Sequence, residues 1–176
     1  MGTPINSLLQ RIAAIGNSRI NEKTIPDLRK LQSELMDYAD SVVPKNDGQE
    51  AREEFDDALN QLTESIDNLD FACDDYELAD ENESREEALE SAGEALIDIG
   101  SDLQELSPLA LYVETTEKVV AAKFSAELKH LSALPAEKVR GSLDLLLNKA
   151  RTPKETSMLL TLAKEAMFSV NKRVSS

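Results

Sequence analysis

The feature that most constrains this fold is a pair of apolar stripes in the middle of the chain. Between about residues 48 and 80, and again between about 85 and 106, apolar side chains recur at alternating steps of four and three. Side chains at this spacing share one side of an α-helix and form a seam that pairs with another helix. The first stripe is Phe55, Leu59, Leu62, Ile66, Leu69, Cys73 and Tyr76, and the second is Leu89, Ala92, Leu96, Ile99, Leu103 and Leu106.

The two stripes are separated by the short polar sequence DENES, residues 80–84. Two seam-bearing helices joined by so short a link are expected to fold back on each other as an antiparallel, coiled-coil-like hairpin. Ala92, Gly93 and Gly100 lie in the second helix, where small residues would let a neighbouring backbone approach closely. Gly100 needs such a reason, because glycine inside a helix costs about 1 kcal/mol relative to alanine.

Helix-start signals and helical spacing extend to both sides of the hairpin. Serine or threonine before proline suits the first turn of a helix, and this pair occurs at Thr3-Pro4, Ser107-Pro108 and Thr152-Pro153. Capping boxes are expected at Asp47 with Glu50, Ser84 with Glu87, and Thr152 with Glu155. The further helices are expected at about 4–16, 26–43, 108–133, 136–150 and 153–173. β-Branched residues between Val113 and Val120 leave a short strand open as an alternative there.

These signals predict an all-α protein, a helical bundle of about six or seven helices that includes the long acidic hairpin. The length of 176 residues suffices for one domain with a core, which aliphatic side chains must build because aromatic residues are only 4% of the chain. We expect a single domain over residues 1–176. Its parts would be N-terminal helices at 1–45, the hairpin at 46–106 and a mildly basic helical subdomain at 107–176.

The acidity of the chain is concentrated in the hairpin. Residues 46–106 hold twenty-two acidic and two basic residues, a net charge of −20, whereas residues 107–176 hold eleven basic and seven acidic ones. A helix of about 30 residues is about 45 Å long, so the hairpin carries one net charge per roughly 2.3 Å. Duplex DNA carries one per about 1.7 Å of its axis. The hairpin could therefore imitate a nucleic-acid backbone toward a basic protein.

Metal sites and catalytic sites have weaker support in the sequence. The acidic run fails the calcium-loop pattern in both registers, since Ala79 and Asp80, or Arg85 and Ser91, occupy defining positions. Glu127 and His130 have the spacing of one di-iron ligand pair, but His130 is the only histidine of the chain. Cys73 lies on the seam, so it is interpreted as a small buried apolar residue. No phosphate loop or catalytic motif is present, and we expect no enzyme activity, cofactor or metal.

The remaining composition favours a soluble cytoplasmic protein. A lone cysteine allows no intrachain disulfide, and the first residues lack the basic region of a signal peptide. No apolar run approaches the length of a membrane span. The acidic charge disfavours direct binding to nucleic acid and to membrane surfaces.

The acidic surface has three interpretations: a solvated face, partly offset by the basic C-terminal third; a docking site for a basic partner protein; or, as a special case of docking, a mimic of DNA. Our first hypothesis is a non-enzymatic binding module, namely an inhibitor, antagonist, immunity protein or chaperone that occupies a basic surface of a partner protein. That partner could itself be a nucleic-acid-binding protein. The alternative is a structural assembly protein, a homo-oligomer that associates through its seams. The expected partner-binding residues are Asp74, Asp75, Glu77, Asp80, Glu81, Glu83, Glu86 and Glu87.

Overall fold

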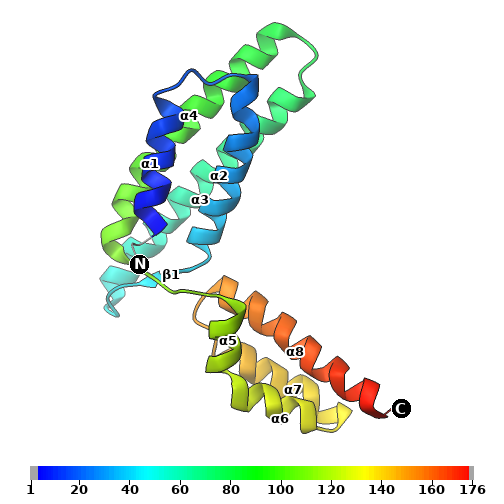
Figure 1. The fold of residues 1–176 in the computed structure, drawn as a ribbon. Coiled ribbons are helices and arrows are strands. Elements are labelled where there is room, and N and C mark those ends of the chain that lie inside the picture. The colour runs from blue at the N-terminus through cyan, green and yellow to red at the C-terminus, as the bar shows by residue number, and fades with distance from the viewer. Residues whose placement is uncertain (1–3, 175–176) are drawn as a thin grey trace. The chain divides into compact units, whose positions relative to one another are not determined.

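The computed structural model of this chain describes residues 4–174, and their side chains as far as residue 168. Within these residues the chain forms eight α-helices, two short 3-10 helices and one two-stranded sheet (Figure 1), which confirms the predicted all-α helical bundle. The chain divides into two compact units, Met1–Tyr112 and Val113–Ser176. The single domain over residues 1–176 stays a prediction.

The first unit is built on the predicted hairpin. Its two long helices pack against each other and are joined by residues 79–81, while α2 packs on α3 and α1 packs on α4. The helices are α1 (Pro4–Gly16), α2 (Ile25–Ala39), α3 (Gln49–Leu78) and α4 (Asn82–Leu106), with the 3-10 helices η1 (Glu22–Thr24) and η2 (Ser107–Leu109). The hairpin therefore forms one half of a four-helix arrangement.

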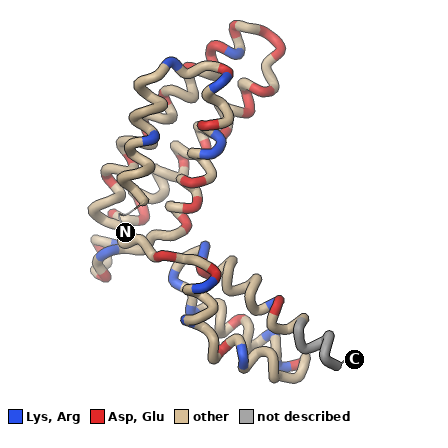
Figure 2. Tube along the Cα trace, in the orientation of Figure 1, with Lys and Arg blue, Asp and Glu red and all other residues tan. Residues whose placement is uncertain are grey.

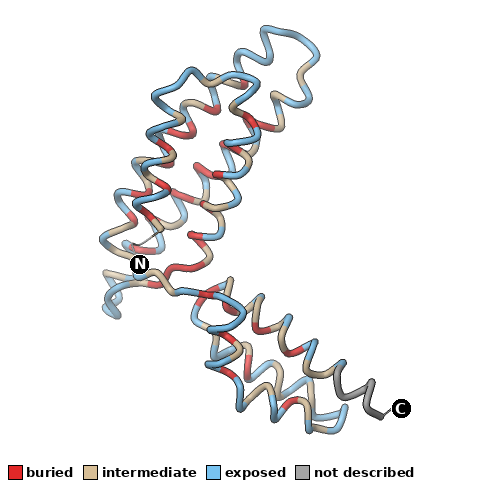
Figure 3. The backbone as a smooth tube through the Cα atoms, in the orientation of Figure 1, coloured by how far each residue is buried: buried red, intermediate tan, exposed pale blue. Residues whose placement is uncertain are grey.

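The core of the first unit lies where these four helices meet (Figure 3). Most of the predicted stripe residues are buried, and Leu59, Tyr76 and Leu89 are partly buried. Burial also reaches beyond each stripe, to Ala58, Ser65, Ala72, Ala88 and Ala95. The buried faces are wider than a two-helix seam because each long helix contacts a second neighbour as well. Coiled-coil geometry for the hairpin stays a prediction.

Gly93 and Gly100 lie against side chains of the N-terminal segment. A Cβ atom added at Gly93 would lie 3.3 Å from Ile20 Cδ1, and one added at Gly100 would lie 3.6 Å from Ile12 Cγ2. At both positions the space beside the glycine is taken by an isoleucine side chain, and the Ile12 side chain belongs to α1, a helix that packs on α4. At Gly93 the contact is tight, whereas at Gly100 it is an ordinary van der Waals distance.

Replacement of Gly100 by alanine is expected to stabilise the first unit by about 1 kcal/mol, because alanine is the better helix former and its methyl group fits against Ile12. The free energy of unfolding in urea, followed by circular dichroism, measures the effect. Gly93→Ala is the matched comparison, and its gain should be smaller because the Ile20 side chain must shift. A loss of stability in Gly100→Ala would contradict the fit.

The regions on either side of the hairpin contain the main departures from the predicted helices. The helix expected at 26–43 ends at Ala39, and the following strand β1 (Val42–Pro44) pairs antiparallel with β2 (Ala110–Tyr112). Tyr38 stacks on Tyr112 beside this pairing, with ring centroids 6.2 Å apart. The prediction of a single helix over residues 108–133 was wrong. Its segment instead forms η2, β2 and two separate helices, α5 (Glu117–Lys123) and α6 (Ser125–Ala133).

The capping predictions had mixed outcomes. The residue before α3 is Gly48 and the residue before α4 is Glu81, and neither makes a side-chain capping bond, so the first two predicted boxes were wrong. At the third position the Thr152 half of the box is confirmed, because the backbone N–H of Glu155 donates to Thr152 Oγ1 at 3.1 Å. The buried Glu155 carboxylate accepts bonds from the backbone N–H of Arg151 and from Lys123 Nζ. It thereby ties the start of the last helix to α5.

The second unit has a core of its own. Its helices are α5, α6, α7 (Ala136–Leu147) and α8 (Pro153–Val174), with α8 packed on each of the other three. The buried residues of this core are Val120, Phe124, Leu131, Leu146, Leu159 and Ala163. None of these six residues belongs to the core of the first unit.

Candidate partner-binding surface

The eight predicted partner-binding carboxylates, here called the acidic tip, gather at the closed end of the α3–α4 hairpin (Figure 2). This end of the hairpin extends past the neighbouring helices of its unit (Figure 1). Asp74 is half-buried and the other seven carboxylates are exposed. Three come from the end of α3 (Asp74, Asp75, Glu77), two from the link (Asp80, Glu81) and three from the first turns of α4 (Glu83, Glu86, Glu87).

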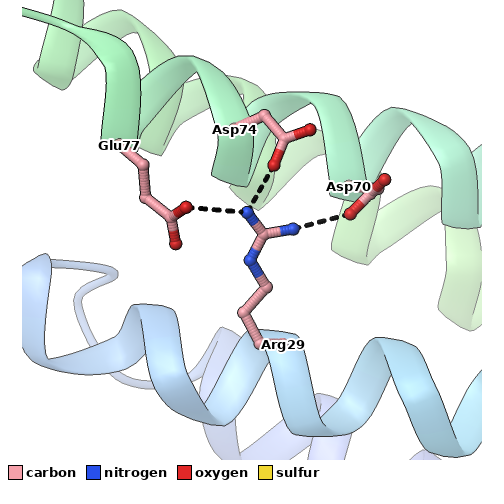
Figure 4. A network of polar contacts seen from close by, with 4 residues as sticks. All are labelled: Arg29, Asp70, Asp74 and Glu77. Carbon is pink, nitrogen blue, oxygen red and sulfur yellow. Dashed lines mark hydrogen bonds and ion pairs between the residues drawn. The ribbon is translucent and has the colours of Figure 1, made fainter.

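Two members of the acidic tip are already paired inside the chain (Figure 4). The Arg29 guanidinium reaches from α2 and donates to Asp74 Oδ1 at 2.5 Å, to Asp70 Oδ1 at 2.6 Å and to Glu77 Oε2 at 3.1 Å. The bond to Asp74 raises the pKa of Arg29, so the guanidinium stays charged. One cation thus holds three carboxylates on one face of α3.

Sequence reasoning missed the role of Arg29. The spacing of Asp70, Asp74 and Glu77 indicates a shared helix face, because residues three and four apart are neighbours on a helix. It does not indicate which residue faces them. Arg29 lies 41 to 48 positions earlier in the chain, and only the packing of α2 on α3 brings it there.

The other six carboxylates of the acidic tip make no ion pair within the residues that the structure describes. Arg85, the basic residue between them, donates through Nε to the carbonyl oxygen of Ala79 at 3.1 Å. It thereby satisfies a carbonyl group at the end of α3, where such groups have no helical partner. The unpaired members are Asp75, Asp80, Glu81, Glu83, Glu86 and Glu87.

A second acidic feature lies beside the acidic tip, in a cavity of about 290 Å³ between the two long helices, here called the α3–α4 groove. Phe71 lies in it with 62% of its surface exposed. The lining residues are Asn68, Phe71, Ala72 and Asp75 from α3, and Ser91, Glu94, Ala95 and Asp98 from α4. Sequence reasoning overlooked Phe71, although its place outside the four-three stripe already indicated an exposed aromatic residue.

Cys73 lies in the core of the first unit and is 1% exposed. Burial raises the pKa of its thiol; the Arg29 guanidinium opposes this increase, and the nearby carboxylates of Glu77, Asp70 and Asp74 add to it. A thiol held neutral in this way is a poor nucleophile. The interpretation of Cys73 as a small buried apolar residue agrees with its burial.

The di-iron candidates Glu127 and His130 both line a cavity of about 380 Å³ in the second unit. Glu127 Oε1 accepts a bond from Lys149 Nζ at 3.4 Å. A bond from its own backbone N–H, with Lys149 adding to it, lowers the pKa of Glu127. Among the described residues no group of three or more His, Cys, Asp or Glu side chains is arranged to hold a metal ion.

Comparisons of the chain with protein-family models, curated proteins and solved structures find no match. None of the helices in the described part of the chain combines the length and the apolar character that crossing a membrane requires.

Proposed function

We propose that this chain is a non-enzymatic cytoplasmic protein whose acidic tip binds a basic surface of another protein, as an inhibitor, antagonist, immunity protein or chaperone does. The observation that carries the proposal is the set of six unpaired, exposed carboxylates at the projecting end of the hairpin. Like charges so close together repel one another, and a basic partner would relieve that repulsion on binding. The same charge would steer the partner toward the tip.

The carboxylates of the hairpin differ in whether they have a partner inside the chain. Some carboxylates farther from the tip have internal partners, as Asp102 accepts from Ser65 Oγ at 2.5 Å and Asp70 from Arg29, whereas Glu94 and Asp98 make no ion pair among the described residues. From Asp80 to Glu87, none of the described residues forms an ion pair with a carboxylate of the acidic tip.

The test is capture of proteins from a lysate of the organism that encodes the chain, with washes at low and high salt. Replacing Asp80, Glu81, Glu86 and Glu87 together by lysine is expected to weaken capture of the specific partner by more than about tenfold, because attraction becomes repulsion. The matched control carries lysine at Glu50, Glu54, Asp56 and Asp57, four exposed carboxylates near the start of α3. It has the same net charge and should retain the partner.

Equal loss in both variants would show that net charge alone attracts the captured proteins, and no loss in either would remove the acidic tip as the binding surface. Where the captured partner binds nucleic acid, displacement of this chain by duplex DNA would identify mimicry of the DNA backbone.

The alternative function, structural self-assembly through the hairpin seams, meets an obstacle in the first unit. The stripe residues lie in its core, so pairing between chains would need the bundle to open. Sedimentation of the pure protein at low and high salt separates the two functions. Self-assembly predicts oligomers that dissociate in salt, whereas partner binding predicts no such change.

A further inference from the structure

The α3–α4 groove combines an exposed aromatic ring with unpaired carboxylates on both of its walls. Phe71 and Asp75 are one turn apart on α3, and Glu94 and Asp98 are one turn apart on α4. The small residues Ala72, Ser91 and Ala95 complete the lining. Phe71 is 62% exposed, so its ring is accessible to another molecule that enters the groove.

The chain itself contains an example of how such a helix face is covered. On another face of α3, carboxylates at the same one-turn spacing, Asp70 and Asp74, are bridged by the Arg29 guanidinium of α2, which packs alongside (Figure 4). In the α3–α4 groove, none of the described lysine or arginine side chains pairs with Asp75, Glu94 or Asp98. The groove thus has the acceptors of the Arg29 site without the arginine.

We propose that the α3–α4 groove binds an arginine on a helix of the basic partner, with the guanidinium stacked on the Phe71 ring. This inference rests on the proposed function and names the contact that gives it specificity. A guanidinium stacks on an aromatic face and still donates in its own plane, which suits carboxylates on both walls. A lysine ammonium offers the charge without the flat surface. The small groove lining leaves room for a helix to approach as α2 does.

The probe is an alanine-based helical peptide with arginines at i, i+4 spacing, titrated into the full ¹⁵N-labelled chain at physiological salt. The expected result is a shift of the backbone amide signals of Phe71, Ser91 and Ala95. Phe71→Ala should weaken binding by about two- to thirtyfold, the range of a cation–π contact. The matched control is Ile97→Ala on α4, because Ile97 is 73% exposed but does not line the groove, and it should bind like the parent chain.

The same peptide with lysine in place of arginine should bind the parent chain more weakly than the arginine peptide does. The two peptides should bind Phe71→Ala equally. Equal binding of both peptides to the parent, or signal shifts confined to residues 80–87, would overturn the groove proposal while the proposed function stood. Groove signals that shift with protein concentration alone would show a second copy as the occupant and would also overturn it. Failure of the acidic tip in the capture experiment is read from different residues, so the two proposals fail separately.

Discussion

Leu159→Ala is expected to destabilise the second unit by about 2–5 kcal/mol, because the fully buried leucine leaves a cavity in the centre of its small core. A unit of this size has only a few kcal/mol of stability to lose, so much of the variant should be unfolded there at 25 °C. Amide hydrogen exchange, read residue by residue, should show lost protection in α5 to α8 and retained protection in α1 to α4.

The matched control is Leu62→Ala in α3, since Leu62 is equally buried but belongs to the core of the first unit. It should show the reverse pattern, with protection lost in the four helices of the first unit. Leu62 and Leu159 belong to separate hydrophobic clusters. Loss of protection across the whole chain in both variants would contradict the separation of the two cores.

Arg29→Met is expected to destabilise the first unit by about 1–2 kcal/mol. Methionine keeps the apolar stem of the side chain but leaves Asp70, Asp74 and Glu77 facing one another without a cation. Hydrogen bonds to charged groups contribute more than that in buried sites, but these carboxylates are more than a third exposed, so solvent screening reduces the effect. Urea unfolding at low and high salt measures it, and added salt should narrow the difference from the parent.

Lys30→Met is the matched control, because Lys30 is the exposed neighbour of Arg29 on α2 and makes no ion pair among the described residues. Its stability should stay within about 0.5 kcal/mol of the parent. Adding Asp74→Asn to Arg29→Met should restore part of the lost stability by removing one of the repelling charges. Equal stability of the parent and Arg29→Met at low salt would show that the ion-pair network contributes nothing.

The Arg29 network also explains how α3 tolerates its charge. Acidic neighbours one turn apart destabilise an isolated helix. In the folded chain α2 supplies a counter-charge for three of the α3 carboxylates, Asp70, Asp74 and Glu77, and on α4 Asp102 accepts a hydrogen bond from the Ser65 hydroxyl of α3. The six unpaired carboxylates of the acidic tip have no such counter-charge among the described residues, and they form the proposed binding surface.

The sequence by itself determined the helices whose evidence is local. Apolar residues at steps of four and three predicted the long hairpin, and its helices, Gln49–Leu78 and Asn82–Leu106, begin and end within a few residues of the expected limits. Pro4 and Pro153 predicted the first residues of α1 and α8, because a helix-start signal is also local in the sequence. The acidic tip could also be predicted, because the link between two helices must lie at one end of the pair.

The tertiary structure decided what depends on contacts between distant residues. Residues far apart in the chain meet where β1 pairs with β2, a pairing that falls within the segment expected to form one helix at 108–133. They also meet where the Arg29 guanidinium of α2 contacts the carboxylates of α3. Periodicity shows which face of a helix is apolar, but not which helix will cover it or which cation will face its carboxylates. Those outcomes follow from packing, which selects one arrangement of the four helices and leaves Phe71 and the acidic tip outside it.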